Sequence, residues 1–129
     1  MAKIGAEALE QIALFQWIKT QPHISRFAFS IPNERKTSPQ TGLLLKRMGL
    51  RPGVSDVFIA VPREMFHGLF IEMKAGKNKT TKSQDEFLSD MRESGYATAI
   101  CYGATEAINI IKNYFGSVST AATQNTSNL

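Results

Sequence analysis

A short apolar segment that ends in charged residues constrains this chain more than any other feature. The run from Gly68 to Ile71 continues directly into Glu72-Met73-Lys74. Successive side chains of a β-strand alternate between the two faces of a sheet, so Glu72 and Lys74 would share one face with Phe70. A buried charge is costly unless it is paired or binds a metal. The segment therefore predicts a buried strand whose charged end has a chemical role.

The composition suits one globular domain. The chain has 129 residues, 43% hydrophobic and 20% charged, which is typical of folded domains. We expect this domain to span residues 1–115 and the Ser-, Thr-, Asn- and Ala-rich segment 116–129 to be a disordered tail. No apolar run approaches the ~20 residues of a membrane helix, and the start does not have the pattern of a secretory signal. The single cysteine, Cys101, lies in an apolar run, which predicts a buried hydrophobic side chain in a reducing cytoplasm.

Periodicity and turn residues divide the chain into alternating helices and strands. Apolar residues at helical spacing predict helices over residues 6–19, 40–48, 82–94 and 105–115. Strands are predicted over residues 26–31, 56–61, 68–74 and 96–102, with the second and third forming a hairpin and the last covered on both faces. The order α-β-α-β-β-α-β-α predicts an α/β fold, a mixed sheet with helices on both faces. The last helix is expected to pack inward through Ala107, Ile108, Ile111 and Phe115.

Two acids on neighbouring predicted strands suggest a metal site. Asp56 opens one strand and Glu72 lies near the end of the next. Mg²⁺ and Mn²⁺ prefer oxygen ligands, and one or two carboxylates with waters and phosphate oxygens often suffice. Lys74 would place an ammonium group beside a phosphodiester under attack. The alternative is a surface salt bridge across the two strands, which contributes little.

Two other helices add candidate polar residues. Gln84 lies on the apolar stripe of the helix predicted over 82–94, so its amide would face inward; alternatively it completes a capping box with Thr81. In the first helix, Glu7 heads a stripe that faces the core, and Glu10 on the neighbouring row competes with it for the site. For either glutamate, the alternative is a solvated acid favoured by the helix dipole.

Together these motifs resemble the VRR-NUC family, the virus-type replication-repair nucleases of the PD-(D/E)xK superfamily. The similarity covers roughly residues 7 to 114. One position departs from the pattern, because Ser55 stands where the superfamily motif has proline. The matching stretches are Glu7-x-x-x-Gln11, Ala13-Leu14-Phe15-x-Trp17, Ile31-Pro32-Asn33, Gly53-Val54-Ser55-Asp56, His67 to Lys74, Gln84 and Gly95-Tyr96.

The resemblance implies a restriction-endonuclease-like fold and metal-dependent hydrolysis of DNA. Asp56 and Glu72 would bind Mg²⁺ or Mn²⁺, with the backbone carbonyl of Met73 as a further ligand. Lys74 would be the catalytic lysine. Gln84 would orient the site or contact DNA, and Glu7 would complete the acidic cluster.

The resemblance also carries expectations about substrate and assembly. Stand-alone members are similar to Holliday-junction resolvases, which implies a homodimer acting on branched DNA in a bacterial or phage-infected cell. A two-fold protein suits a two-fold junction. The candidate DNA contacts lie in predicted loops: Asn33, Arg35, Lys36, Lys77 and Lys79. The alternative for each is an exposed loop residue with no role in binding.

Three functions remain open from the sequence. The leading one is a metal-dependent DNA endonuclease selective for junctions or flaps, the second is a nicking or restriction-like nuclease, and the third is a silent DNA-binding module of the same fold. The intact Asp56, Glu72 and Lys74 argue against the third. No glycine-rich phosphate loop indicates a nucleotide cofactor, and the isolated His23 and His67 do not form a zinc pattern.

Overall fold

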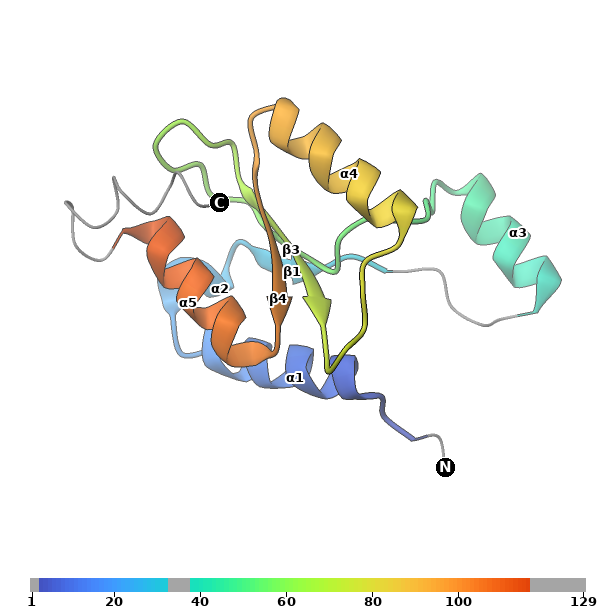
Figure 1. The fold of residues 1–129 in the computed structure, drawn as a ribbon, viewed down its shortest axis with the longest axis horizontal. Coiled ribbons are helices and arrows are strands. Elements are labelled where there is room, and N and C mark those ends of the chain that lie inside the picture. The colour runs from blue at the N-terminus through green and yellow to red at the C-terminus, as the bar shows by residue number, and fades with distance from the viewer. Residues whose placement is uncertain (1–2, 33–37, 117–129) are drawn as a thin grey trace.

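A computed structural model describes residues 3–32 and 38–116 of the chain. The predicted tail over 116–129 therefore lies outside the described residues, apart from Gly116. Within the described ranges no helix has the length and apolar character needed to cross a bilayer. The elements follow in the order α1 (Ala6–Ile18), α2 (Pro22–Ser25), β1 (Ala28–Ser30), α3 (Pro39–Arg47), β2 (Val57–Ile59), β3 (Leu69–Lys74), α4 (Lys82–Glu93), β4 (Ala97–Tyr102) and α5 (Ala104–Phe115) (Figure 1).

The strands form one mixed sheet in the order β1-β2-β3-β4. β1 and β2 are antiparallel, as are β2 and β3, whereas β3 and β4 are parallel and joined through α4. The register pairs Ile71 with Val57 on one side and with Ala99 on the other. All six residues of β3 are buried, because this central strand has a neighbour on both edges and helices over its faces.

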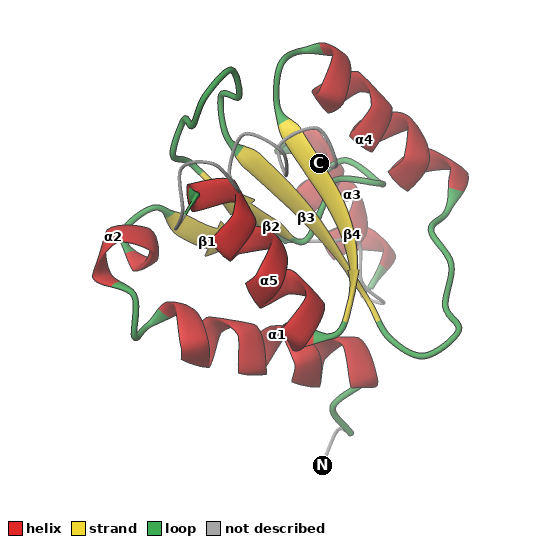
Figure 2. Ribbon diagram, turned by 60° about the vertical axis from the view of Figure 1, so that its left-hand side comes forward, coloured by secondary structure: helices red, strands yellow, loops and turns green. Residues whose placement is uncertain are grey.

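Helices cover the two faces of the sheet unequally (Figure 2). α1 and α5 pack together against one face, where Leu69, Ile71 and Met73 of β3 join the hydrophobic core. On the other face, Phe70 stacks on Phe58 with ring centroids 4.3 Å apart and meets Phe87 of α4 edge-on. Because side chains alternate along β3, Glu72 and Lys74 share the face of Phe70.

The predicted fold class is confirmed, and most element boundaries agree within one or two residues. The strand predicted over 26–31 shortens to three residues, and the short helix α2 was not predicted, because Pro22 reads as the end of a helix although it starts one. The prediction that the last strand is covered on both faces was wrong. β4 forms an edge of the sheet and leaves Ile100 41% and Tyr102 42% exposed.

The inward face of the last helix agrees with the prediction and includes one further residue. Ala107 and Ile111 are fully buried, and Ile108 and Phe115 are partly buried and pack against the core. Tyr114 is also buried, and its hydroxyl donates a hydrogen bond of 2.6 Å to the carbonyl oxygen of Val61. This bond satisfies the polar end of the tyrosine, so the ring can pack in the core.

Candidate active site

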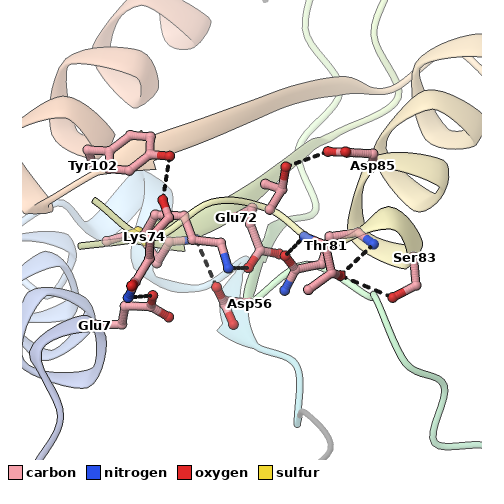
Figure 3. Close-up of polar contacts among 12 residues, drawn as sticks. Glu7, Asp56, Glu72, Lys74, Thr81, Ser83, Asp85 and Tyr102 are labelled. Carbon is pink, nitrogen blue, oxygen red and sulfur yellow. Dashed lines mark hydrogen bonds and ion pairs between the residues drawn. The ribbon is translucent and has the colours of Figure 1, made fainter. Parts of the chain in front are cut away.

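Asp56 immediately precedes β2 and is held against β3. Its side chain is buried, and Oδ2 accepts a hydrogen bond of 2.8 Å from the backbone N–H of Met73. Its carbonyl oxygen accepts a second bond of 2.8 Å from the N–H of Ile31, just after β1. Asp56 is therefore fixed to β3 through its side chain (Figure 3) and to the segment after β1 through its backbone.

The loop before Asp56 depends on a glycine. Gly53 has a φ of +87°, and a Cβ placed there would lie 2.5 Å from the carbonyl oxygen of Ser83. Only glycine tolerates both the left-handed backbone and this close approach. Gly53 thus allows the loop to lie against the first turn of α4, and Asp56 follows three residues later.

Glu72 is buried beside Asp56 on the sheet face covered by α4. Its side chain is 2% exposed, and Oε1 has no hydrogen-bond partner among the described residues. Burial raises the pKa of Glu72 to about 8, and the negative charge of Asp56, a side-chain hydrogen bond to Asp56 and the charge of Glu7 act in the same direction. A hydrogen bond between two carboxyl groups needs a proton on one of them, so this contact and the burial both favour the protonated form of Glu72.

Lys74 is the only cation that the structure places against Glu72 within the described ranges. Its Nζ lies 3.8 Å from Oε2 of Glu72, and its side chain is also buried (Figure 3). The charge of Lys74 lowers the pKa of Glu72, but burial and the neighbouring acids outweigh it. The ammonium group of Lys74 therefore lies beside Glu72 within a buried site.

Gln84 forms the capping box that the sequence left open. Its Oε1 accepts from the backbone N–H of Thr81 at 2.9 Å, and its own backbone N–H donates to Oγ1 of Thr81 at 3.2 Å. This reciprocal pair starts α4. The capping box does not use the side-chain amide nitrogen of Gln84, so this nitrogen remains available for a second role in the site.

Glu7 approaches the site through the loop between β3 and α4. Its Oε2 accepts a hydrogen bond of 2.9 Å from Nδ2 of Asn78, whose carbonyl oxygen accepts one of 2.7 Å from the hydroxyl of Tyr102. Its charge contributes to the raised pKa of Glu72. α1, this loop and β4 are thereby joined next to the two acids (Figure 3).

Glu10, the competing acid of the first helix, has a different partner. Its Oε1 accepts a hydrogen bond of 2.7 Å from the backbone N–H of Ala104, in the first turn of α5. α5 has no side-chain cap of its own at Gly103, so Glu10 supplies it from α1. Glu10 therefore binds a helix terminus, and Glu7 is the first-helix acid coupled to Glu72.

The arrangement fits a divalent cation held by two carboxylates. Within residues 3–32 and 38–116, no three His, Cys, Asp or Glu side chains converge tightly enough to form a metal-binding group, so Glu7 does not complete one as placed. Asp56 and Glu72 do lie together, and a buried carboxylate oxygen without a partner is a suitable ligand. The donor set consists of oxygens, which Mg²⁺ and Mn²⁺ prefer.

The predicted DNA contacts divide into two groups. Lys77 and Lys79 lie exposed in the loop between β3 and α4, on either side of Asn78. The remaining three, Asn33, Arg35 and Lys36, lie outside the described residues. The loop that links Glu7 to β4 therefore also carries two of the predicted phosphate contacts.

Sequence reasoning missed Asn78 and Tyr102. Asn78 lies in a basic loop where asparagine is common, and Tyr102 ends a predicted strand, so neither position carried a separate signal. From the sequence, Gly53 is a turn residue at the start of a matching stretch. Its special role follows from contact with Ser83, a residue thirty positions away that no local pattern connects to it.

Comparison with known proteins agrees with this geometry. A solved structure described as a "VRR_NUC domain protein" superposes with a TM-score of 0.74 at 26% sequence identity, over 88% of this chain and 90% of the other. No curated protein matches the chain. The family model of the VRR-NUC domain matches residues 6–105. The chain therefore belongs to the VRR-NUC domain family, which is a nuclease-type family.

Proposed function

We propose that this protein is a DNA endonuclease that depends on Mg²⁺ or Mn²⁺ and cuts at the site formed by Asp56, Glu72 and Lys74. The observation that carries the proposal is the pair of buried acids, Asp56 and Glu72, with Lys74 beside Glu72. Burial and repulsion by Asp56 raise the pKa of Glu72 to about 8. A bound cation would offset this repulsion and lower the pKa again. Perturbed carboxylates of this kind are frequent in active sites.

Each residue has a distinct part in the proposal. Asp56 and Glu72 would hold the ion, with the Met73 carbonyl as a further ligand. When bound, the metal would polarise the phosphodiester and favour ionisation of a water molecule. Lys74 would stabilise the negative charge that develops on the phosphate oxygens, because its ammonium group is fixed in the buried site and need not reorganise.

The polar residues around this centre would keep it in place. Glu7 would add negative charge at the edge of the site. Asn78 would hold Glu7 in place through its side-chain amide. Asn78 lies in the same loop as Lys77 and Lys79. Those two lysines would contact DNA phosphates, and phosphate contacts position a duplex without reading its sequence. Gln84 would orient the site from the start of α4 while completing the capping box.

A cleavage assay tests the proposal. Purified protein is incubated with linear, flapped and four-way DNA in Mg²⁺, in Mn²⁺ and in EDTA, and the products are resolved on denaturing gels. We expect cleavage with at least one metal and none in EDTA. The absence of cleavage of every DNA form with both metals would exclude the nuclease proposal and favour a silent DNA-binding module.

Metal binding is tested separately by thermal unfolding without DNA. A cation that binds only the folded protein raises its melting temperature in proportion to the logarithm of its concentration. We expect Mn²⁺ to stabilise the wild-type protein and to have no such effect on an Asp56→Asn, Glu72→Gln double variant. Equal stabilisation of both proteins would place the ion elsewhere.

We further propose a homodimer that acts on branched DNA, with α3 in the interface. α3 buries none of its residues. Leu43 and Leu44 on this helix are exposed, as is Met48 at its C-cap. A nine-residue helix is marginal alone in water, so a partner surface would stabilise it. Light scattering should give twice the chain mass for the wild type and a lower mass for a Leu44→Glu, Met48→Glu variant. A wild-type monomer at micromolar concentration would exclude this part of the proposal.

The substrate assay also separates the alternative activity. A junction- or flap-selective enzyme should cut branched DNA much faster than linear DNA of the same sequence. Equal rates on all forms, or a single nick at a preferred sequence, would support a nicking or restriction-like nuclease instead.

A further inference from the structure

A cavity lies at the opposite end of α1 from Glu7. It has a volume of roughly 600 Å³, within the range of small-molecule sites. Helix α1 rises about 1.5 Å per residue, so the ten residues from Glu7 to Trp17 separate this cavity from the acid by about 15 Å along the helix. Its described lining residues include no acid: Trp17, Gln21, His23, Ile24, Arg63, Lys112 and Phe115.

Two cations in this cavity are held against aromatic rings. The guanidinium of Arg63 lies 5.6 Å from the ring centroid of Phe115 and donates a hydrogen bond to its carbonyl oxygen. Nζ of Lys112 lies 5.9 Å from the ring of Trp17. Within the described part of the chain, neither cation has a carboxylate partner. Their charges are therefore oriented but not neutralised, which favours an anionic ligand.

The aromatic side chains add a requirement for a flat ligand. The ring of His23 meets Phe115 edge-on at 5.5 Å, and Trp17 is only partly buried on the helix that borders the cavity. An aromatic surface next to cations suits a molecule that has both a planar ring and a negative group. A nucleotide has this combination, because its base can stack while its phosphate meets the cations.

We propose that this cavity binds a nucleotide unit of single-stranded DNA, with the base against Trp17 or Phe115 and the phosphate between Arg63 and Lys112. The choice of a nucleotide over another aromatic anion rests on the proposed nuclease function. The cavity borders α1 and α5, whereas Glu72 and Lys74 lie on the sheet face of α4. It would thus hold a strand away from the point of cleavage, and binding there would not require catalysis.

The chain offers a direct reporter, because Trp17 is its only tryptophan. Full-length protein is titrated with an oligothymidine of ten nucleotides in EDTA, where we expect no cleavage. The fluorescence emission of Trp17 reports contact at the cavity. The fluorescence anisotropy of the same oligonucleotide, carrying a label, reports total binding. We expect saturable quenching of Trp17 with the same midpoint as the anisotropy change. An anisotropy change without quenching would place the DNA elsewhere and overturn the proposal.

Two charge variants provide a matched comparison. Lys112→Gln removes a cation from the cavity, and Arg26→Gln removes one held 5.6 Å from the ring of Phe27 outside it. We expect Lys112→Gln to weaken binding several-fold and to make the slope of log K against log salt shallower by about 0.7, one phosphate contact for a single strand. Arg26→Gln should bind as the wild type does. Equal behaviour of the two variants would overturn the assignment.

Two further ligands define the chemistry. An abasic oligonucleotide of equal length tests the base, and binding as tight as that of the thymidine oligonucleotide would show that phosphate alone is recognised, against the proposal. Thymidine monophosphate tests whether the ligand is a free nucleotide or a nucleotide within a DNA strand. If it quenches Trp17 at the same concentration as the oligonucleotide does, the nucleotide chemistry is supported and a free nucleotide is the ligand. Because these measurements exclude metal, they stand whether or not the cleavage assay succeeds.

Discussion

The backbone N–H of Met73 donates a hydrogen bond of 2.8 Å to Oδ2 of Asp56. Met73 separates Glu72 from Lys74 in the chain, so this bond places Asp56 beside the segment of β3 that carries Glu72 and Lys74. The side chain of Met73 points to the opposite face and is buried in the core. Packing on one face of β3 therefore fixes the polar site on the other.

Replacing Lys74 with methionine should slow cleavage strongly while the protein remains folded. Methionine keeps the length and the apolar stem, but it removes the ammonium group that lies 3.8 Å from Glu72. Loss of one oriented electrostatic group commonly lowers the rate about 10²–10³-fold. Single-turnover cleavage rates at saturating metal measure this loss.

The matched control for that change is Lys19→Met. Lys19 is exposed at the end of α1, so its replacement removes the same charge from the surface. Its cleavage rate should stay close to that of the wild type. If Lys74→Met cuts DNA as fast as Lys19→Met does, Lys74 is not the catalytic lysine.

Glu72 should make the metal-free protein less stable as the pH rises. Its pKa is raised from 4.5 to about 8 in the folded protein. Between these values the unfolded chain loses the proton while the folded chain keeps it, so unfolding releases a proton and becomes easier with increasing pH. The fall is at most about 1.4 kcal/mol per pH unit and ends above the folded pKa.

A Glu72→Gln variant tests this pH dependence. Glutamine has a similar shape and no ionisable proton, so its advantage over the wild type should be small at pH 4.5 and greatest near pH 8. Urea unfolding in EDTA at several pH values measures the difference in the free energy of unfolding. Parallel profiles for the two proteins would show that Glu72 titrates normally.

The sequence predicted the central strand and its charged end because these features are local. Alternation along residues 69–74 determines which side chains share a face, and the structure follows it. The Gln84 capping box was also a local pattern, since its partner is only three residues away. The roles assigned to Asp56, Glu72 and Lys74 remain predictions, although the structure brings these residues together.

What the sequence did not reveal depends on contacts between distant segments. Glu7 and Glu10 look equivalent on one helix, and they are distinguished by Asn78 and Ala104, which lie more than seventy residues away. The exposure of Ile100 follows from the position of β4 at the sheet edge, which depends on strand order rather than on the composition of the strand.

Gly53→Ala should reduce both stability and cleavage. A side chain there would be strained by the positive φ and would also meet the backbone of Ser83 at 2.5 Å. Gly49 is the matched control, since it also has a positive φ, +109°, but has nothing within 4 Å of its Cβ position. Both alanine variants should lose about 1–2 kcal/mol from backbone strain. Only Gly53→Ala should lose more and displace Asp56, which chemical denaturation and cleavage rates would measure together.

Two changes at Gln84 separate capping from a role in the site. Gln84→Ala breaks the bond to the N–H of Thr81 and should cost about 1 kcal/mol of stability. Gln84→Glu keeps the acceptor, because glutamate also completes a capping box, so the free energy of unfolding should change little. If Gln84 faces DNA, the added negative charge should still weaken binding. Unchanged cleavage by Gln84→Glu would limit this residue to the start of α4.

Substitutions of Glu7 and Glu10 should have different effects on cleavage and on stability. Glu7→Gln removes a charge that is coupled to Glu72, so we expect slower cleavage with little loss of stability, since glutamine still accepts from Asn78. Glu10→Ala removes the acceptor for the N–H of Ala104 and should cost about 1 kcal/mol without changing the rate at saturating metal. Parallel urea unfolding and single-turnover cleavage would distinguish the two effects. Slower cleavage by Glu10→Ala with normal cleavage by Glu7→Gln would reverse the assignment and place Glu10 in the active site.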